Sequence, residues 1–149
     1  MKTETAPLAL RLELRRTFDF PVERVFTAWT DIRQLATWLG GDCATQRRVE
    51  GEFRVGGVCH FLGEGENGPC AVDIKCREIV PNSRIVFTWT AVKSSCGNDG
   101  DTTVTVTFRA LGQKTEVHLV HEGFLTDESR QAHNYGWTSS LEKLALKLA

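Results

Sequence analysis

The stretch TDESRQAHNYGWTSSLEKLALKLA, residues 126–149, decides the fold. Its apolar side chains recur at helical spacing, and at ~100° per residue they form one stripe. The stripe consists of Trp137, Leu141, Leu144 and Leu148. Thr126 or Asp127 can cap the start of this helix. About 22 residues of helix span roughly 33 Å, close to the width of a domain of this size, so we expect the rest of the chain to pack around it.

The same stripe becomes polar towards the start of the helix, where it continues through Arg130, His133 and Asn134. Such a gradient suits a helix whose second half covers a core while its first half borders a more polar space. The alternative is an ordinary amphipathic helix whose first turns reach the surface. The residues alone leave both interpretations open.

Residues 8–20 alternate between apolar and polar side chains, which predicts a strand with one buried face from Leu8 onwards. Arg16 falls on the apolar side of this strand, so either it escapes to water at a kink or it points into an internal space. Pro21 and the apolar residues that follow it at helical spacing predict a short helix. Asp31 is the candidate N-cap of a second short helix, and Gly40-Gly41 ends it.

Residues 49–124 show only the patterns of strands and turns. The expected strands cover residues 50–55, 58–63, 70–80, 84–93, 102–110 and 115–123. Gly56-Gly57 is typical of a two-residue hairpin between the first two of them. Short turns between consecutive strands favour an antiparallel meander. We therefore predict an α+β fold in a single domain, residues 1–149. In it, an antiparallel sheet of six to seven strands curves around the terminal helix and leaves a gap beside it, with two short helices after the first strand.

Composition excludes several classes of function. The chain has 149 residues and a net charge of −1, without a cluster of basic residues, so we expect no nucleic-acid partner. No apolar run reaches the ~18 residues of a membrane span. The first residues lack the apolar core and cleavage site of a signal peptide, so we expect a cytoplasmic protein, present as a monomer or weak dimer.

The five cysteines show neither CxxC spacing nor a paired framework. They are Cys43, Cys59, Cys70, Cys76 and Cys96. We expect reduced thiols, mostly buried as small apolar side chains. A reactive thiol is the alternative, although no neighbour in the sequence indicates one.

An ordered set of segments resembles the START-like helix-grip superfamily, also called Bet v 1-like or SRPBCC. Within that superfamily it resembles the family named after the activator of Hsp90 ATPase, in its bacterial single-domain form. The segments are RTFDFPVERVFTAWTD (16–31), Trp38, GEFRVGG (51–57), IVPNSRIVFTW (79–89), TTVTVTF (102–108), LVHEGF (119–124) and HNYGWTSSLEKL (133–144). They cover nearly the whole chain in the family's order. No single segment is diagnostic, but the set, which ends in His-x-x-Gly-Trp, is specific as a whole.

The resemblance implies an internal cavity between the sheet and the long helix. Relatives mostly bind apolar or amphipathic small molecules there, and a few use the cavity for cyclase, hydratase or hydrolase reactions. The eukaryotic namesake stimulates Hsp90. This chain matches only the C-terminal-type domain, so a chaperone partner is the weaker expectation.

Aromatic side chains on the expected inner faces are candidate ligand contacts, because ligand sites are mostly apolar with a few polar groups. We predict that Trp89 and Trp137 form walls of the cavity, with Phe26, Trp38 and Phe108 as further contacts. Plain core packing is the alternative for each of them.

Arg16, His121 and His133 are the polar residues that we predict to face the same space. His121 points inward near the end of its strand, and His133 lies on the inner stripe of the helix that follows. An inward Arg16 could pair with a ligand carboxylate or phosphate. The alternatives are two hydrogen-bonded structural histidines, and an arginine that reaches water or pairs with an internal acid.

The sequence contains no recognisable catalytic set or metal site, because GxSxG, a P-loop, HExxH and a catalytic carboxylate pair are all missing. We therefore predict a protein that binds a small hydrophobic or amphipathic molecule without a cofactor. An enzyme with His121 or His133 as acid or base is the first alternative. A chaperone cofactor that acts through its outer surface is the second, although no large exposed apolar stripe supports it.

Overall fold

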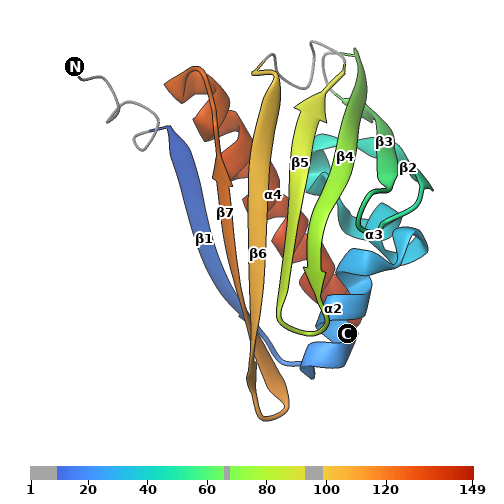
Figure 1. Cartoon of the computed structure of the whole chain (residues 1–149), viewed down its shortest axis with the longest axis vertical. Helices are drawn as coiled ribbons and strands as arrows, with labels where there is room; N and C mark the ends of the chain where they lie inside the picture. The colour runs from blue at the N-terminus through green and yellow to red at the C-terminus, as the bar shows by residue number, and fades with distance from the viewer. Residues whose placement is uncertain (1–9, 66–67, 93–98) are drawn as a thin grey trace.

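The computed structural model describes residues 10–65, 68–92 and 99–149, and its elements follow the predicted order (Figure 1). Strand β1 (Arg11–Phe18) leads into helices α2 (Val22–Thr30) and α3 (Ile32–Trp38) and the 3-10 helix η1 (Gly41–Cys43). The next strands are β2 (Thr45–Gly51), β3 (Val58–Gly65), β4 (Gly68–Val80), β5 (Arg84–Ala91), β6 (Asp101–Leu111) and β7 (Lys114–Glu122). Helix α4 (Asp127–Leu148) follows. Leu8, where we expect the first strand to begin, lies outside the described residues.

The described strands form one seven-stranded antiparallel sheet in the order β1-β7-β6-β5-β4-β3-β2. Consecutive strands pair from β2 to β7, and β1 pairs with β7 at the opposite edge. Helix α4 crosses one face of this sheet diagonally, and α2 and α3 lie beside its last turns (Figure 1). The predicted α+β helix-grip fold, with a curved sheet around the terminal helix, is confirmed.

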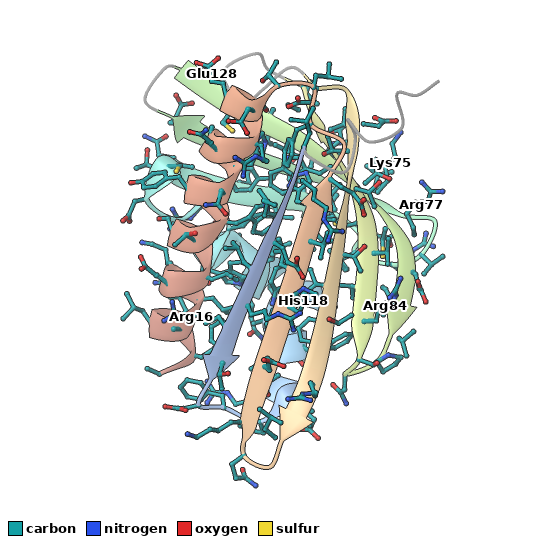
Figure 2. The ribbon with its side chains drawn as sticks, turned by 90° about the vertical axis from the view of Figure 1, so that its left-hand side faces the viewer. Arg16, Lys75, Arg77, Arg84, His118 and Glu128 are labelled. Atoms are coloured by element: carbon teal, nitrogen blue, oxygen red, sulfur yellow. The ribbon has the colours of Figure 1, made fainter. Side chains whose placement is uncertain are left out.

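Two irregular positions lie in the strands towards the β2 edge of the sheet. The register of β4 against β5 shifts between Cys76 and Glu78, and that of β2 against β3 shifts between Thr45 and Arg48. An extra residue of this kind bends its strand and increases the local twist. In the edge-on view of Figure 2, α4 lies on one side of the sheet while Lys75, Arg77 and Arg84 project from the other.

Helix α4 has the length and the cap that its sequence predicts. The Thr126 side chain accepts a hydrogen bond from the Ser129 backbone nitrogen at 3.0 Å, and 22 residues of helix follow. The whole predicted apolar stripe is buried: Trp137, Leu141, Leu144 and Leu148 are each 4% exposed or less. No helix in the described parts of the chain has the length and apolar content needed to cross a bilayer.

The prediction of a two-residue hairpin at Gly56-Gly57 is wrong. Strand β2 already ends at Gly51, which pairs with Cys59 of β3. Gly51 has φ +105°, and a Cβ there would lie 2.2 Å from the Val58 carbonyl oxygen, so the chain leaves the ladder at a position that only glycine suits. Residues 52–57 form a longer loop instead, in which the Phe53 ring packs edge-on against Phe87.

The expectation of reduced cysteines holds for part of the set. Cys43, Cys59 and Cys76 are free thiols, and burial raises the pKa of Cys59 to about 11, so it stays protonated. Cys70 is disulfide-bonded, which corrects the prediction at that residue. Sequence spacing alone could not reveal this, because a disulfide depends on which residues the fold brings close together. Cys96 lies outside the described residues.

Candidate functional site

A cavity of about 770 Å³ lies between the first half of α4 and the sheet edge formed by β2, β3 and β4. Its deepest side chains are buried and apolar: Leu39, Ala44, Phe61, Val72 and Trp137. Its mouth is bordered by exposed residues of η1, β2 and α4, namely Asp42, Cys43, Thr45, Ala132 and Tyr135. This volume is within the range of pockets that hold small organic ligands.

On one side of the cavity, η1 and α4 form a tight junction. The Gly40 backbone nitrogen donates to Ser140 Oγ at 2.9 Å, and the Asp42 backbone nitrogen donates to Ser139 Oγ at 2.8 Å. Gly41 lies between these two bonds, and a Cβ there would be only 2.4 Å from Ser139 Oγ. The two helices therefore meet backbone to backbone at this point, and residues of the junction form part of the cavity wall.

Arg47, a residue of β2, stabilises the same junction. Its guanidinium donates to the carbonyl oxygens of Gly41 at 2.8 Å and Ala44 at 2.6 Å, and to those of Ala36 and Thr37 in α3. All these acceptors are backbone groups at or near the ends of short helices, which otherwise lack partners. Arg47 thus holds η1 in place through four hydrogen bonds.

His121 lies behind the cavity, where it joins α4 to the sheet. Trp137 Nε1 donates to His121 Nδ1 at 3.0 Å, so His121 Nδ1 is an acceptor and the ring proton is on Nε2. His121 Nε2 then donates to Thr102 Oγ1 at 2.7 Å, and Thr102 Oγ1 donates to the Trp89 carbonyl oxygen at 2.7 Å. His121 is fully buried, and both of its ring nitrogens are used within the protein.

The environment of His121 favours the neutral imidazole. Burial lowers the pKa of His121 well below its ordinary value, and the neighbouring His133 lowers it further. The neutral form is also the one that its two hydrogen bonds require. His121 therefore offers no free nitrogen to a molecule in the cavity.

His133 lies on the cavity wall, next to the His121 ring and closer to the mouth. Its Nδ1 donates to the Ser129 carbonyl oxygen at 2.8 Å, one helical turn earlier, which leaves Nε2 for another partner. Ser129 is held in turn by Asp99, whose Oδ2 accepts from Ser129 Oγ at 2.5 Å. No described residue is bonded to His133 Nε2.

A continuous series of rings leads from the cavity into the core. Trp89 packs against Trp137 with ring centroids 5.2 Å apart, and Trp137 stacks on Trp29 at 5.9 Å. Trp29 contacts Trp38 and Phe108, and Phe108 contacts Phe26. The cavity wall is thus backed by rigid aromatic packing, which favours a preformed space over a collapsed one.

The predicted site residues fall into two groups. Trp89, His133 and Trp137 line the cavity. The others lie elsewhere: Phe26, Trp38, Phe108 and His121 are buried in the core behind it, and Arg16 is half-buried with its guanidinium 5.6 Å from the Phe18 ring. Figure 2 places Arg16 at the side of the molecule where β1 lies beside α4. A ligand contact at any of these residues stays a prediction.

Several lining residues were not predicted from the sequence. Phe61 and Val72 share the inward parity of β3 and β4, which is a usable signal. Gly136 lines the cavity in the middle of α4, where glycine is costly unless something needs the space. Cys43 lies opposite it, with Sγ 4.0 Å from where a Gly136 Cβ would be.

Comparison with known proteins places this geometry in a family. The family model described as activator of Hsp90 ATPase homolog 1-like protein matches residues 19–149. A search of the curated proteins found none that is similar to the chain.

Solved structures share the fold over nearly the whole chain. A protein from Chromobacterium violaceum is 28% identical with a TM-score of 0.84, over 94% of this chain and 97% of that one. An AHSA1 protein from Silicibacter pomeroyi is 25% identical with a TM-score of 0.78, over 93% of this chain and 96% of that one. The resemblance predicted from the ordered segments is confirmed by these matches.

Proposed function

The chain belongs to the family of activator of Hsp90 ATPase homolog 1-like proteins, and on that premise we propose that it binds a small hydrophobic or amphipathic molecule in the cavity beside α4. The observation that carries the proposal is the 770 Å³ space itself, with an apolar floor and one imidazole nitrogen, His133 Nε2, that no described residue contacts by a hydrogen bond. Burying apolar ligand surface supplies the affinity, at about 25 cal/mol per Å², and His133 Nε2 supplies orientation.

Each side chain has a distinct part in this proposal. Trp89 and Trp137 contact the ligand as walls, and His133 accepts a hydrogen bond from it. His121, with its two internal bonds, fixes the orientation of Trp137. Phe26, Trp38 and Phe108 support the wall from behind.

Native mass spectrometry of freshly purified protein is the direct test, because a bound molecule would appear as a discrete mass increment. Titration with Nile red, an uncharged fluorescent dye, gives an affinity that does not depend on co-purification. Replacing Gly136 with Phe puts a ring into the cavity, since only Cys43 Sγ lies within 4 Å of a Cβ at that position. We expect Gly136→Phe to weaken Nile red binding at least tenfold.

Thr138→Phe is the matched control, because residue 138 is exposed on the same helix and is not among the lining residues. It should leave Nile red binding unchanged. If both variants bind the dye like the unmodified protein, the dye does not occupy this cavity and the proposal fails.

An enzymatic role receives no added support from the site. Both nitrogens of His121 are engaged, and no carboxylate in the described residues is bonded to His133 to form an acid–base pair. A binding role needs neither group to transfer a proton, so it is the simpler proposal.

A further inference from the structure

We propose that the ligand of this cavity is an amphipathic organic cation, a molecule with an apolar body and an ammonium-type head group. This inference rests on the proposed binding function and specifies its ligand class. Two independent features of the wall carry it: the sign of the carboxylates at its mouth and the rings that face the space.

The charged residues among the described lining are both acidic. Asp42 borders the mouth from η1, and Glu64 borders it from β3. A third carboxylate, Asp99, lies next to the lining residue His133, to which it is linked through Ser129. Carboxylates at the edge of a low-dielectric cavity raise the local concentration of cations, so these three groups favour a cationic head group over an anionic one.

Basic side chains on the neighbouring elements already donate hydrogen bonds within the protein. Arg47 donates to four backbone carbonyl groups, and Arg130 pairs with Asp127 at 2.7 Å. Arg16, the residue expected to receive an anionic head group, is not in the lining. A carboxylate or phosphate in the cavity would therefore lose hydration without gaining a basic partner from the described lining.

His133 Nε2 and the buried donor Trp89 Nε1 are the ring nitrogens of the described wall that have no hydrogen-bond partner among the described residues. His133 Nδ1 donates to Ser129, so Nε2 is the ring nitrogen of His133 that is open to a ligand. Ser140 Oγ already accepts from Gly40 and donates to the Gly136 carbonyl oxygen, which uses its single proton. A protonated amine can donate to Nε2 of a neutral imidazole.

Aromatic rings complete the match. Trp89, Trp137, Phe61 and Tyr135 belong to the lining, and the faces of such rings attract cations. Aromatic walls with nearby carboxylates are the usual surroundings of bound ammonium groups, whereas fatty-acid anions need a basic side chain or several N–H donors.

Three probes of equal chain length and different charge separate the possibilities: octylammonium, 1-octanol and octanoate, titrated by calorimetry below their aggregation concentrations. We expect octylammonium to bind more tightly than octanol, and octanoate to bind most weakly. Added salt should reduce the difference, because screening acts on the charge term alone. Equal affinity for the three, or tighter binding of octanoate, would overturn the inference.

Asp42→Asn tests the source of the preference. Removing one carboxylate near the mouth should weaken octylammonium binding roughly threefold at low salt, strengthen octanoate binding and leave octanol unchanged. Glu142→Gln removes an exposed carboxylate of α4 outside the lining and should change none of the three by as much.

Failure of this inference is distinguishable from failure of the proposed function. Octanol binding that is blocked by Gly136→Phe, without any preference for the cation, would retain the binding function and reject the ligand class. No binding of any of the three probes would count against both.

Discussion

At the scale of single residues, the protonation state of His121 connects stability to pH. The folded protein holds this imidazole neutral, with its pKa lowered by burial and then by His133, whereas the unfolded chain titrates near the ordinary value of 6.5. Below that pH the unfolded state binds a proton that the folded state does not. Stability is therefore full above about pH 6.5 and falls as the pH decreases, by at most about 1.4 kcal/mol per pH unit from this group.

His121→Gln removes the titrating ring and tests this prediction. We expect the free energy of unfolding of the unmodified protein to fall more steeply between pH 7 and pH 5 than that of the variant, measured by urea titration at several pH values. The carboxylates titrate in both proteins, so the comparison isolates the histidine. Parallel pH profiles would mean that His121 is not held neutral in the folded state.

Strand parity predicts which face of the sheet a side chain occupies, but not how far that side chain lies from the cavity. Strand parity correctly put His121 inward, yet the hydrogen bonds of His121 to Trp137 and Thr102 depend on contacts between segments far apart in the chain. Arg16 shares the inward parity of its strand, but it lies against Phe18 and away from the cavity. Such distances follow from how strongly the sheet curves, which parity does not encode.

At the scale of secondary-structure elements, replacement with alanine should have opposite effects on stability at two glycines, one in η1 and one in α4. A Cβ at Gly41 would lie 2.6 Å from the Ser139 backbone carbon, and its φ of +54° is unfavourable for other residues. A Cβ at Gly136 meets nothing closer than Cys43 Sγ at 4.0 Å. Gly41→Ala should destabilise by about 2 kcal/mol or more, and Gly136→Ala should stabilise by roughly 0.5–1 kcal/mol because alanine favours the helix.

Thermal or urea unfolding of the two variants measures the predicted loss and gain of stability in one experiment, and each variant is a control for the other. If Gly41→Ala were neutral, η1 and α4 would have to be further apart than the structure places them. If Gly136→Ala were destabilising, the space beside that glycine would already be filled.

Elements whose signal is local were predicted well. Helix α4 was found because its cap at Thr126 and its apolar stripe both follow from the sequence of the helix itself. The side chain of Asp31 caps α3 in the same local way. The β2–β3 connection was mistaken because Gly56-Gly57 resembles a tight hairpin, while the residue that ends the strand is Gly51, whose close approach to Val58 appears only after the strands have paired.

At the scale of the whole molecule, the predicted gap between sheet and helix exists, but its position along α4 could not be derived from the sequence. The space lies towards the β2–β4 edge, where Phe61 and Val72 form the floor. The core aromatics Phe26, Trp38 and Phe108 fill the region that could equally have been hollow. Which half of the helix borders the cavity depends on the bulges in β2 and β4 and on the short contact between η1 and α4.

This division of α4 makes a prediction about motion. Residues 141–145 include Leu141 and Leu144, which are packed into the core, whereas residues 132–136 border the cavity and an exposed surface. Segments with few buried apolar contacts open locally at a lower free energy than packed ones. In hydrogen exchange followed by mass spectrometry, we expect the amides of residues 132–136 to exchange at least tenfold faster than those of residues 141–145.

Adding 1-octanol should slow exchange in residues 132–136 and leave residues 141–145 unchanged, since only the first segment borders the cavity. Uniform protection along the helix, or slowing in both segments together, would indicate that α4 opens as one unit and that the cavity does not lie under its first half.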